Sequence, residues 1–464
     1  VELMTEKLRR LSPDTRKLLE LAACIGYRFP VSILALVSER APAVVGRELK
    51  QGIGGGLIAP LDDAYQLLEL EQAPETVEVT VEFAFAHDRI QQAAYAMLED
   101  EQRRRVHLRI GRLLSHGFSA EQQESRLFEI VDHFNLAVDL ITDSGERDQL
   151  CRLNLSAGKR AKWANAYQQA FAYLQQAMAL LPAAAWQDDY PLALEIHIQA
   201  AESACVIASY ESMEKILASG FENAKTLLDR VELYLVKISA CLGRGELKEA
   251  IRIAKPVLRQ LGHRYPAKPG KIHVIAKLLR LQWRLRGKTM DELRSLPEMT
   301  NPGRLAAMRI GTRIGGAAMF IEPHLLNLMT LHAVEMTTMH GHSPISLTSY
   351  AAYGMILAEA LDRPEQGQGF GRLAMDLTRR LRAREMEGRV SHIYNGLVRH
   401  WKEPIGNCLE PLRESFQMCL ENGDFEFAAH AVCVRMLYAF ESGMHLEHWN
   451  SELESSHEAL KPLN

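Results

Sequence analysis

Helical periodicity runs through nearly all of the chain from residue 120 to residue 464, and it restricts the possible folds more than any other feature. Short turn phrases that lead into helical patterns recur along this stretch: Ala164-Asn165-Ala166-Tyr167, Ala208-Ser209-Tyr210-Glu211, Gly243-Arg244-Gly245-Glu246-Leu247 and Asn422-Gly423-Asp424-Phe425. Helix pairs that stack on their neighbours bury a continuous core without long-range strand pairing. The pattern therefore predicts an α-solenoid.

One helix pair has a recognisable repeat pattern. Ala170, Leu174, Ala177 and Pro182 fit the second half of a tetratricopeptide unit, A-x3-F-x2-A-x4-P, with Leu in place of Phe. Small residues there let two helices approach closely, and the proline ends the second helix. The first three turn phrases are spaced by 43 and 37 residues, against ~34 in an ideal tetratricopeptide array. The sequence thus predicts degenerate, TPR-like repeats.

The first 116 residues have a different organisation. Ser12-Pro13-Asp14 predicts a helix start and Gly26 a helix stop, and further helices are expected over 31–38 and 42–51. The alternation of polar with apolar residues from Val77 to Phe85 predicts a strand, the second of a pair. Three helices followed by a β-hairpin is the order of a winged-helix domain. A helix over 101–116 is expected to link this domain to the repeats.

The glycine-rich run from Gly52 to Gly56 is not a phosphate-binding loop. No Lys-Ser/Thr pair follows it, and no strand of apolar residues precedes it. We interpret it as a turn that flanks the wing.

His87 and Asp88 lie where the strand pattern changes into a helical one, which begins at Arg89. A helix start has free backbone N–H groups and a positive dipole end, so this junction suits a phosphate or a carboxylate. These three residues are the candidate site.

Composition and motifs exclude several functions. The net charge of −4 argues against a dedicated nucleic-acid surface. The sequence contains no run of 18 apolar residues, so no membrane span is predicted. No phosphate-binding loop, kinase or GxSxG motif is present, so no catalytic residue is assigned. His332, His340 and His342 lack a further ligand at suitable spacing, so no metal site is predicted either. The seven cysteines form no CxxC pair, and we interpret them as buried free thiols in a reducing cytosol.

A proline- and glycine-rich loop is expected over 265–270, followed by a basic amphipathic segment over 275–288. The favoured interpretation is a helix packed on the solenoid with its basic face in solvent. A membrane-surface or nucleic-acid role is the less favoured alternative.

Several stretches, in order along nearly the whole chain, carry a family resemblance. They are Gly56-Leu57-Ile58; Phe85-Ala86-His87-Asp88-Arg89 with Gln91-Gln92-Ala93-Ala94-Tyr95; Leu296-Pro297-Glu298-Met299-Thr300-Asn301-Pro302; His340-Gly341-His342-Ser343-Pro344-Ile345-Ser346 with Tyr350, Tyr353 and Gly354; and Phe370-Gly371-Arg372-Leu373-Ala374. They resemble the winged-helix and helical-repeat region of very large bacterial and cyanobacterial signalling proteins. Such proteins combine a serine/threonine kinase domain, a STAND-type ATPase, helical repeats, a GAF domain and a sensor histidine kinase. His342 stands where that family usually has Asn.

The resemblance implies a nucleotide-sensing role for His87, which would fold back onto ADP held by an upstream ATPase domain. Asp88 would cap the helix, orient His87 or pair with Arg89. In the alternative, Asp88 is only an N-cap and His87 packs on the wing. ATP or ADP and Mg²⁺ are implied for the parent protein, with no cofactor in this segment.

The resemblance also predicts the domain organisation. A winged-helix domain is expected over 1–116, TPR-like repeats over 117–264 and further solenoid helices over 265–464. The chain begins with Val and ends in mid-pattern, so we expect it to be a piece of a longer protein. We expect this piece to be non-catalytic and cytoplasmic.

Two classes of function remain open at this stage. The first is a regulatory segment of a signalling ATPase-kinase, whose solenoid binds a protein partner. The second is a STAND-type transcription regulator. The helix expected over 42–51 carries only Arg47 and Lys50 as cations, against Glu48, so it is a poor reader of DNA and nucleic acid is an unlikely partner. A scaffold with no link to nucleotide is a third possibility.

Overall fold

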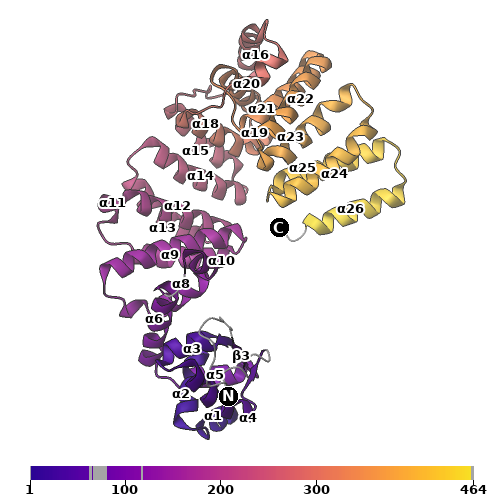
Figure 1. The fold of residues 1–464 in the computed structure, drawn as a ribbon. Coiled ribbons are helices and arrows are strands. Elements are labelled where there is room, and N and C mark those ends of the chain that lie inside the picture. The colour runs from indigo at the N-terminus through magenta and orange to yellow at the C-terminus, as the bar shows by residue number, and fades with distance from the viewer. Residues whose placement is uncertain (1, 62–64, 66–80, 117–118, 461–464) are drawn as a thin grey trace. The chain divides into compact units, whose positions relative to one another are not determined.

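The structure is a computed structural model that describes residues 2–61, 65, 81–116 and 119–460. As predicted, the chain is mainly α-helical, with a small sheet near its start and TPR-like helix pairs after it (Figure 1). It divides into two compact units, Val1–Ile216 and Leu217–Asn464, which are described separately below. No helix in the described ranges is both long and apolar enough to cross a membrane.

The first unit begins with helices α1 (Glu2–Arg9), α2 (Pro13–Ile25), α3 (Val31–Ser38) and α4 (Pro42–Gly54). The predicted start of α2 is confirmed, since the Ser12 hydroxyl accepts the N–H of Thr15 at 3.2 Å. Gly26 ends the helix as predicted. We expected a turn to begin at Gly52, but this was wrong, because helix α4 continues to Gly54.

A three-stranded antiparallel sheet follows the order β1-β3-β2, with β1 (Arg28–Pro30), β2 (Ile58–Pro60) and β3 (Glu82–Phe85). The β2–β3 pair is the predicted hairpin, and β1 is a third strand that the sequence did not predict. Phe29 of β1 packs on Phe83 and Phe85 of β3, with ring centroids 6.1 and 5.4 Å apart. Of the strand predicted from Val77, residues 77–80 lie outside the described residues.

The remaining helices of the first unit are α5 (Asp88–Ala96), α6 (Asp100–His116), α7 (Ala120–Ser125), α8 (Leu127–Asn135), α9 (Ser144–Trp163), α10 (Tyr167–Leu180), α11 (Ala185–Asp188) and α12 (Tyr190–Val206); α13 (Tyr210–Asn223) crosses into the second unit. Helices α9 and α10 form the predicted TPR-like pair. Ala170, Leu174 and Ala177 are completely buried, as the repeat pattern requires.

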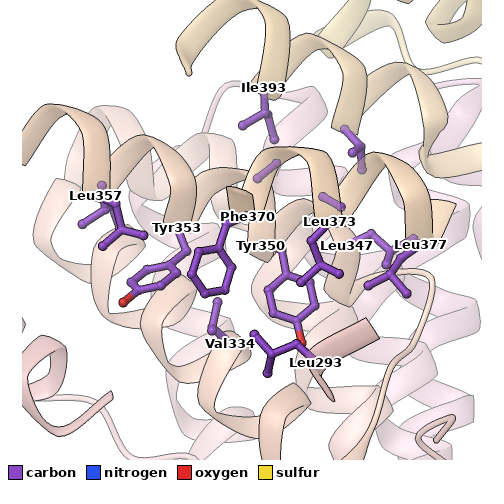
Figure 2. Packing of buried hydrophobic residues seen from close by; sticks show 14 of the residues in the cluster. Leu293, Val334, Leu347, Tyr350, Tyr353, Leu357, Phe370, Leu373, Leu377 and Ile393 are labelled. Atoms are coloured by element: carbon purple, nitrogen blue, oxygen red, sulfur yellow. The ribbon is translucent and has the colours of Figure 1, made fainter. Parts of the chain in front are cut away.

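The helices of the second unit are α14 (Leu227–Gly243), α15 (Leu247–Gln260), α16 (Lys271–Leu285), α17 (Met290–Arg294), α18 (Pro302–Arg313), α19 (Gly315–Ile321), α20 (Pro323–His340), α21 (Ser346–Leu361), α22 (Pro364–Arg380), α23 (Arg384–Leu397), α24 (Leu409–Glu421), α25 (Phe425–Glu441) and α26 (Leu446–Leu460). One core cluster of this unit lies among α16, α17, α20, α21, α22 and α23. Figure 2 shows Tyr350 and Tyr353 of α21 on either side of Phe370 of α22.

The predicted turn phrases share one backbone geometry. Asn165, Ala208, Gly245 and Gly423 all have left-handed φ angles, between 57° and 73°. The N–H of the next residue donates to the carbonyl five positions earlier, at 2.8 Å in all four turns. This bond is that of a Schellman motif, so each of these helices ends on the same self-contained turn.

Helix α16 packs on the solenoid as predicted, but its basic face is not simply solvated. Leu278 and Leu281 are buried, whereas a second apolar stripe is exposed; it consists of Ile272 (81% exposed), Ile275 (54%), Leu279 (60%) and Trp283 (74%). The cations Lys277 and Arg284 turn instead toward α20. A helix with two apolar stripes leaves room for its polar side chains only between them.

These cations meet the carboxylate of Glu335, which is only 6% exposed. Lys277 pairs with one carboxylate oxygen, while the Nε atoms of Arg280 and Arg284 lie 3.2 and 2.9 Å from the other. Burial acts to raise the pKa of Glu335, but the hydrogen bond from Lys277 and the charges of the two arginines outweigh it, so the pKa is lowered. We call Glu335 and these three cations the Glu335 cluster.

Candidate functional site

His87 lies directly between β3 and α5, as the sequence predicted. The central strand β3 is fixed by its two neighbours, and Phe85 at its end is buried. On the other side, the side-chain amide of Gln91 in α5 donates to the carbonyl of Ala23 at 3.2 Å, which ties α5 to α2. The junction is therefore held on both sides by packed elements.

The His87 ring caps α5. Its Nδ1 accepts the backbone N–H of Arg89 at 3.1 Å, and the residue has an extended backbone with φ −158° and ψ 143°. Because an acceptor nitrogen carries no proton, the neutral ring has its proton on Nε2. The residue is exposed, so His87 offers a hydrogen-bond donor beside the positive end of a helix.

One expectation about the neighbours of His87 was wrong. Asp88 is not the N-cap but the first residue of α5, because His87 itself takes the capping position. His87 itself is exposed. Arg89 is exposed as well, and no ion pair between Asp88 and Arg89 occurs in the described part of the chain. A role for these residues in nucleotide sensing stays a prediction.

A chain of polar groups begins at the half-buried Tyr95 on the same helix and continues into the interior. The Tyr95 hydroxyl in α5 lies 3.0 Å from Nε2 of His107 in α6, and Nδ1 of His107 lies 2.9 Å from Nδ1 of His133 in α8. Both histidines are buried. This chain, which we call the histidine relay, joins the helix that His87 caps to the first helices of the solenoid.

Burial lowers the pKa of both relay histidines to about 4, with a further contribution from Arg103 at His107 and from His107 at His133. The folded state therefore keeps them neutral at pH 7. In the unfolded chain they titrate near pH 6.5.

The first prediction concerns the pH dependence of stability. Between about pH 6.5 and 4 the unfolded chain binds more protons than the folded one, so the relay stabilises the fold fully above pH 6.5 and loses this contribution as the pH falls toward 4. Each proton adds a slope of about 1.4 kcal/mol per pH unit. Unfolding measured from pH 4.5 to 7.5 should show a shallower slope in a His107→Leu/His133→Leu variant. Equal slopes in the two proteins would contradict the assignment.

The three histidines considered for a metal site do not come together as ligands. His332 is paired with His263, whose Nδ1 lies 2.7 Å from Nε2 of His332. His342 is buried, and its Nε2 donates to the carbonyl of Leu293 at 2.9 Å. Within the described ranges, no group of three or more His, Cys, Asp or Glu side chains is placed to bind a metal.

The structure brings together two of the stretches that carried the family resemblance. His342 N–H donates to the carbonyl of Pro297 at 2.7 Å, and Met299 N–H donates to the carbonyl of His342 at 2.6 Å. Glu298 and His342 form an isolated parallel bridge. These stretches thus form one structural joint, in which Met299 and His342 are buried.

The cysteines are free, and most are buried as predicted; Cys205 is half-buried and Cys433 is exposed. The sequence analysis did not predict the histidine relay or the Glu335 cluster. His107 and His133 both fall within helical patterns, and nothing else in the sequence indicated that their side chains would meet.

The chain has only low similarity to known proteins. No family model matches the chain. It is 22% identical to hybrid signal transduction histidine kinase G of Dictyostelium discoideum, over 96% of the chain and 15% of that protein. Among solved structures it is similar to a Signal Transduction ATPase with Numerous Domains (STAND) protein with a tetratricopeptide repeat sensor from Pyrococcus horikoshii, at 12% identity and a TM-score of 0.36, over 98% of the chain and 64% of that structure.

Proposed function

We propose that the chain is a regulatory segment of a larger cytoplasmic signal-transduction protein. It would couple the nucleotide state of an upstream ATPase domain to a protein partner on the solenoid and to a downstream histidine kinase. The observation that carries this proposal is the alignment of 96% of the chain with a hybrid signal transduction histidine kinase. The chain spans only about 15% of that relative, so catalysis by the whole protein would reside in other domains.

The geometry of His87 supports a sensing role within this proposal. Nδ1 is occupied by the cap, so the donor Nε2–H of the exposed ring is available for an outside acceptor. A phosphate oxygen of ADP is such an acceptor, and the end of α5 adds positive potential. The histidine relay gives a contiguous path of polar contacts from α5 to α8.

The second prediction tests this role in the full-length parent protein. His87→Asn keeps a good N-cap but removes the imidazole, whereas His87→Ala removes both. Loss of a hydrogen bond to a charged phosphate weakens binding by about 1.5–3 kcal/mol. We therefore expect both variants to release a fluorescent ADP analogue roughly 10- to 100-fold faster.

The matched control is His457→Ala, an exposed histidine in α26 that should leave ADP release unchanged. Unchanged release of the ADP analogue by the His87→Asn variant would show that His87 acts only as a helix cap. ATP hydrolysis by the chain alone would overturn the regulatory assignment.

The second candidate, a STAND-type transcription regulator, is less well supported. Arg47 and Lys50 of α4 are exposed, but two cations give this helix only a weakly positive surface for DNA. Salt-sensitive binding of the chain to random duplex DNA would favour this candidate.

A further inference from the structure

A cavity of about 220 Å³ lies inside the second unit. Its walls come from α18, α19, α20, α21, α23 and α25. This volume is below the ~300–1,000 Å³ typical of sites for drug-sized ligands, so an occupant would be a smaller molecule.

Most of the cavity wall is apolar and adaptable. Five methionines line it: Met308, Met319, Met329, Met336 and Met355. Methionine is flexible and polarisable and makes favourable contacts with aromatic rings. On α18 the cavity reaches the helix backbone, since a methyl group added at Gly311 would meet no atom within 4 Å. This wall suits a compact apolar body such as a benzene ring.

One polar atom in the wall has no partner. His392 is only 2% exposed, and its Nδ1 is buried without a hydrogen bond in the described structure. The ring packs edge-on against Phe427 and His430, with centroids 5.9 and 6.1 Å away. Burial, with the nearby His430, lowers the pKa of His392 to about 4, so the ring is neutral at pH 7. A buried polar atom of this kind is unfavourable unless something hydrogen-bonds to it.

The charges of the wall favour a cation. Arg389 is engaged elsewhere, because its guanidinium forms two hydrogen bonds with Asp424. Glu426, by contrast, is an exposed residue of the wall, and no cation among the described residues lies within 4.0 Å of its carboxylate. This carboxylate reaches from α25 to Gly316 of α19, where an added methyl group would lie 2.0 Å from Oε1.

We propose that this cavity binds a small primary amine with an apolar, aromatic body. Its ammonium group would pair with Glu426 and donate a hydrogen bond to Nδ1 of His392, while its ring would lie among the methionines. A charge-assisted hydrogen bond and a filled apolar wall together supply both orientation and affinity. The site is independent of the proposed nucleotide sensing, and it would give the solenoid a chemical input of its own.

The third prediction tests the site with three probes of similar size. Phenethylamine, neutral 2-phenylethanol and anionic 3-phenylpropanoate are titrated into the chain by calorimetry. Phenethylamine should bind at least about tenfold more tightly than the alcohol, and the acid should be weaker still. Glu426→Gln should remove the preference for the amine over the alcohol.

A cavity-filling variant separates binding from folding. Gly311→Leu places a side chain in the open space and should abolish amine binding, while Gly311→Ala is a smaller control that should keep it. Unchanged binding in Gly311→Leu, equal affinity for the amine and the acid, or no binding of any probe at millimolar concentration would each overturn the proposal.

Discussion

Replacing Gly341 by alanine is expected to destabilise the second unit by about 3 kcal/mol or more. Gly341 ends α20 with φ 99°, a conformation that side chains rarely adopt. An added Cβ would also lie 2.2 Å from the carbonyl oxygen of Pro297, which is backbone and cannot rotate away. The same carbonyl accepts the N–H of His342, so relief of the clash would break the joint between the two stretches.

The matched control is Gly262→Ala. Gly262 also has a positive φ, 92°, but an added methyl group there meets nothing within 4 Å. The Gly262→Ala substitution should lower the free energy of unfolding by about 1–2 kcal/mol, because only the backbone conformation is unfavourable. Native-state hydrogen exchange of the Met299 and His342 amides would measure the local effect. Equal losses of stability in the two variants would show that the Pro297 contact is unimportant.

Replacing Glu335 by glutamine should destabilise the second unit by about 3–5 kcal/mol. The amide has the same shape but no charge, so it leaves Lys277, Arg280 and Arg284 facing one another without compensation. Two of these cations are themselves largely covered, with side-chain exposures of 17% for Lys277 and 28% for Arg284. Removing one partner of a buried ion pair is costly for this reason.

Glu410→Gln is the control for this variant. Glu410 pairs with Arg413 on the surface of α24, and both side chains are more than half exposed. Its removal should not change chemical denaturation measurably. A Glu335→Met/Lys277→Met double variant should recover part of the loss, because it removes the charge together with one of its partners. A loss in Glu335→Gln no larger than in Glu410→Gln would refute the assigned role of the cluster.

Much of the helical architecture could be predicted because its signals are local. The Ser12 cap, the Gly26 stop and the bounds of α3 each depend on a few neighbouring residues. The pair α9–α10 was predicted from the spacing of Ala170, Leu174 and Ala177 in the sequence, and all three are buried in the structure. Caps and periodicity act within one or two turns, so they can be read without knowledge of the tertiary fold.

What could not be predicted depends on partners far away in the sequence. Strand β1 has three residues, and its partner β3 begins more than fifty positions later. The inward turn of Lys277 depends on Glu335, and the burial of His107 depends on His133. At the junction, sequence preference favours Asp over His as a cap, yet the backbone at the end of β3 places His87 in that position.

The Schellman turns described above also bear on how such a chain can change over evolutionary time. Each turn lies within a helix pair, as at Asn165 between α9 and α10, and is closed by a hydrogen bond between residues five positions apart, so it needs no contact with the next pair. A pair can therefore be duplicated, lost or lengthened together with its own turn. The unequal spacings of 43 and 37 residues are what such piecewise growth would leave behind.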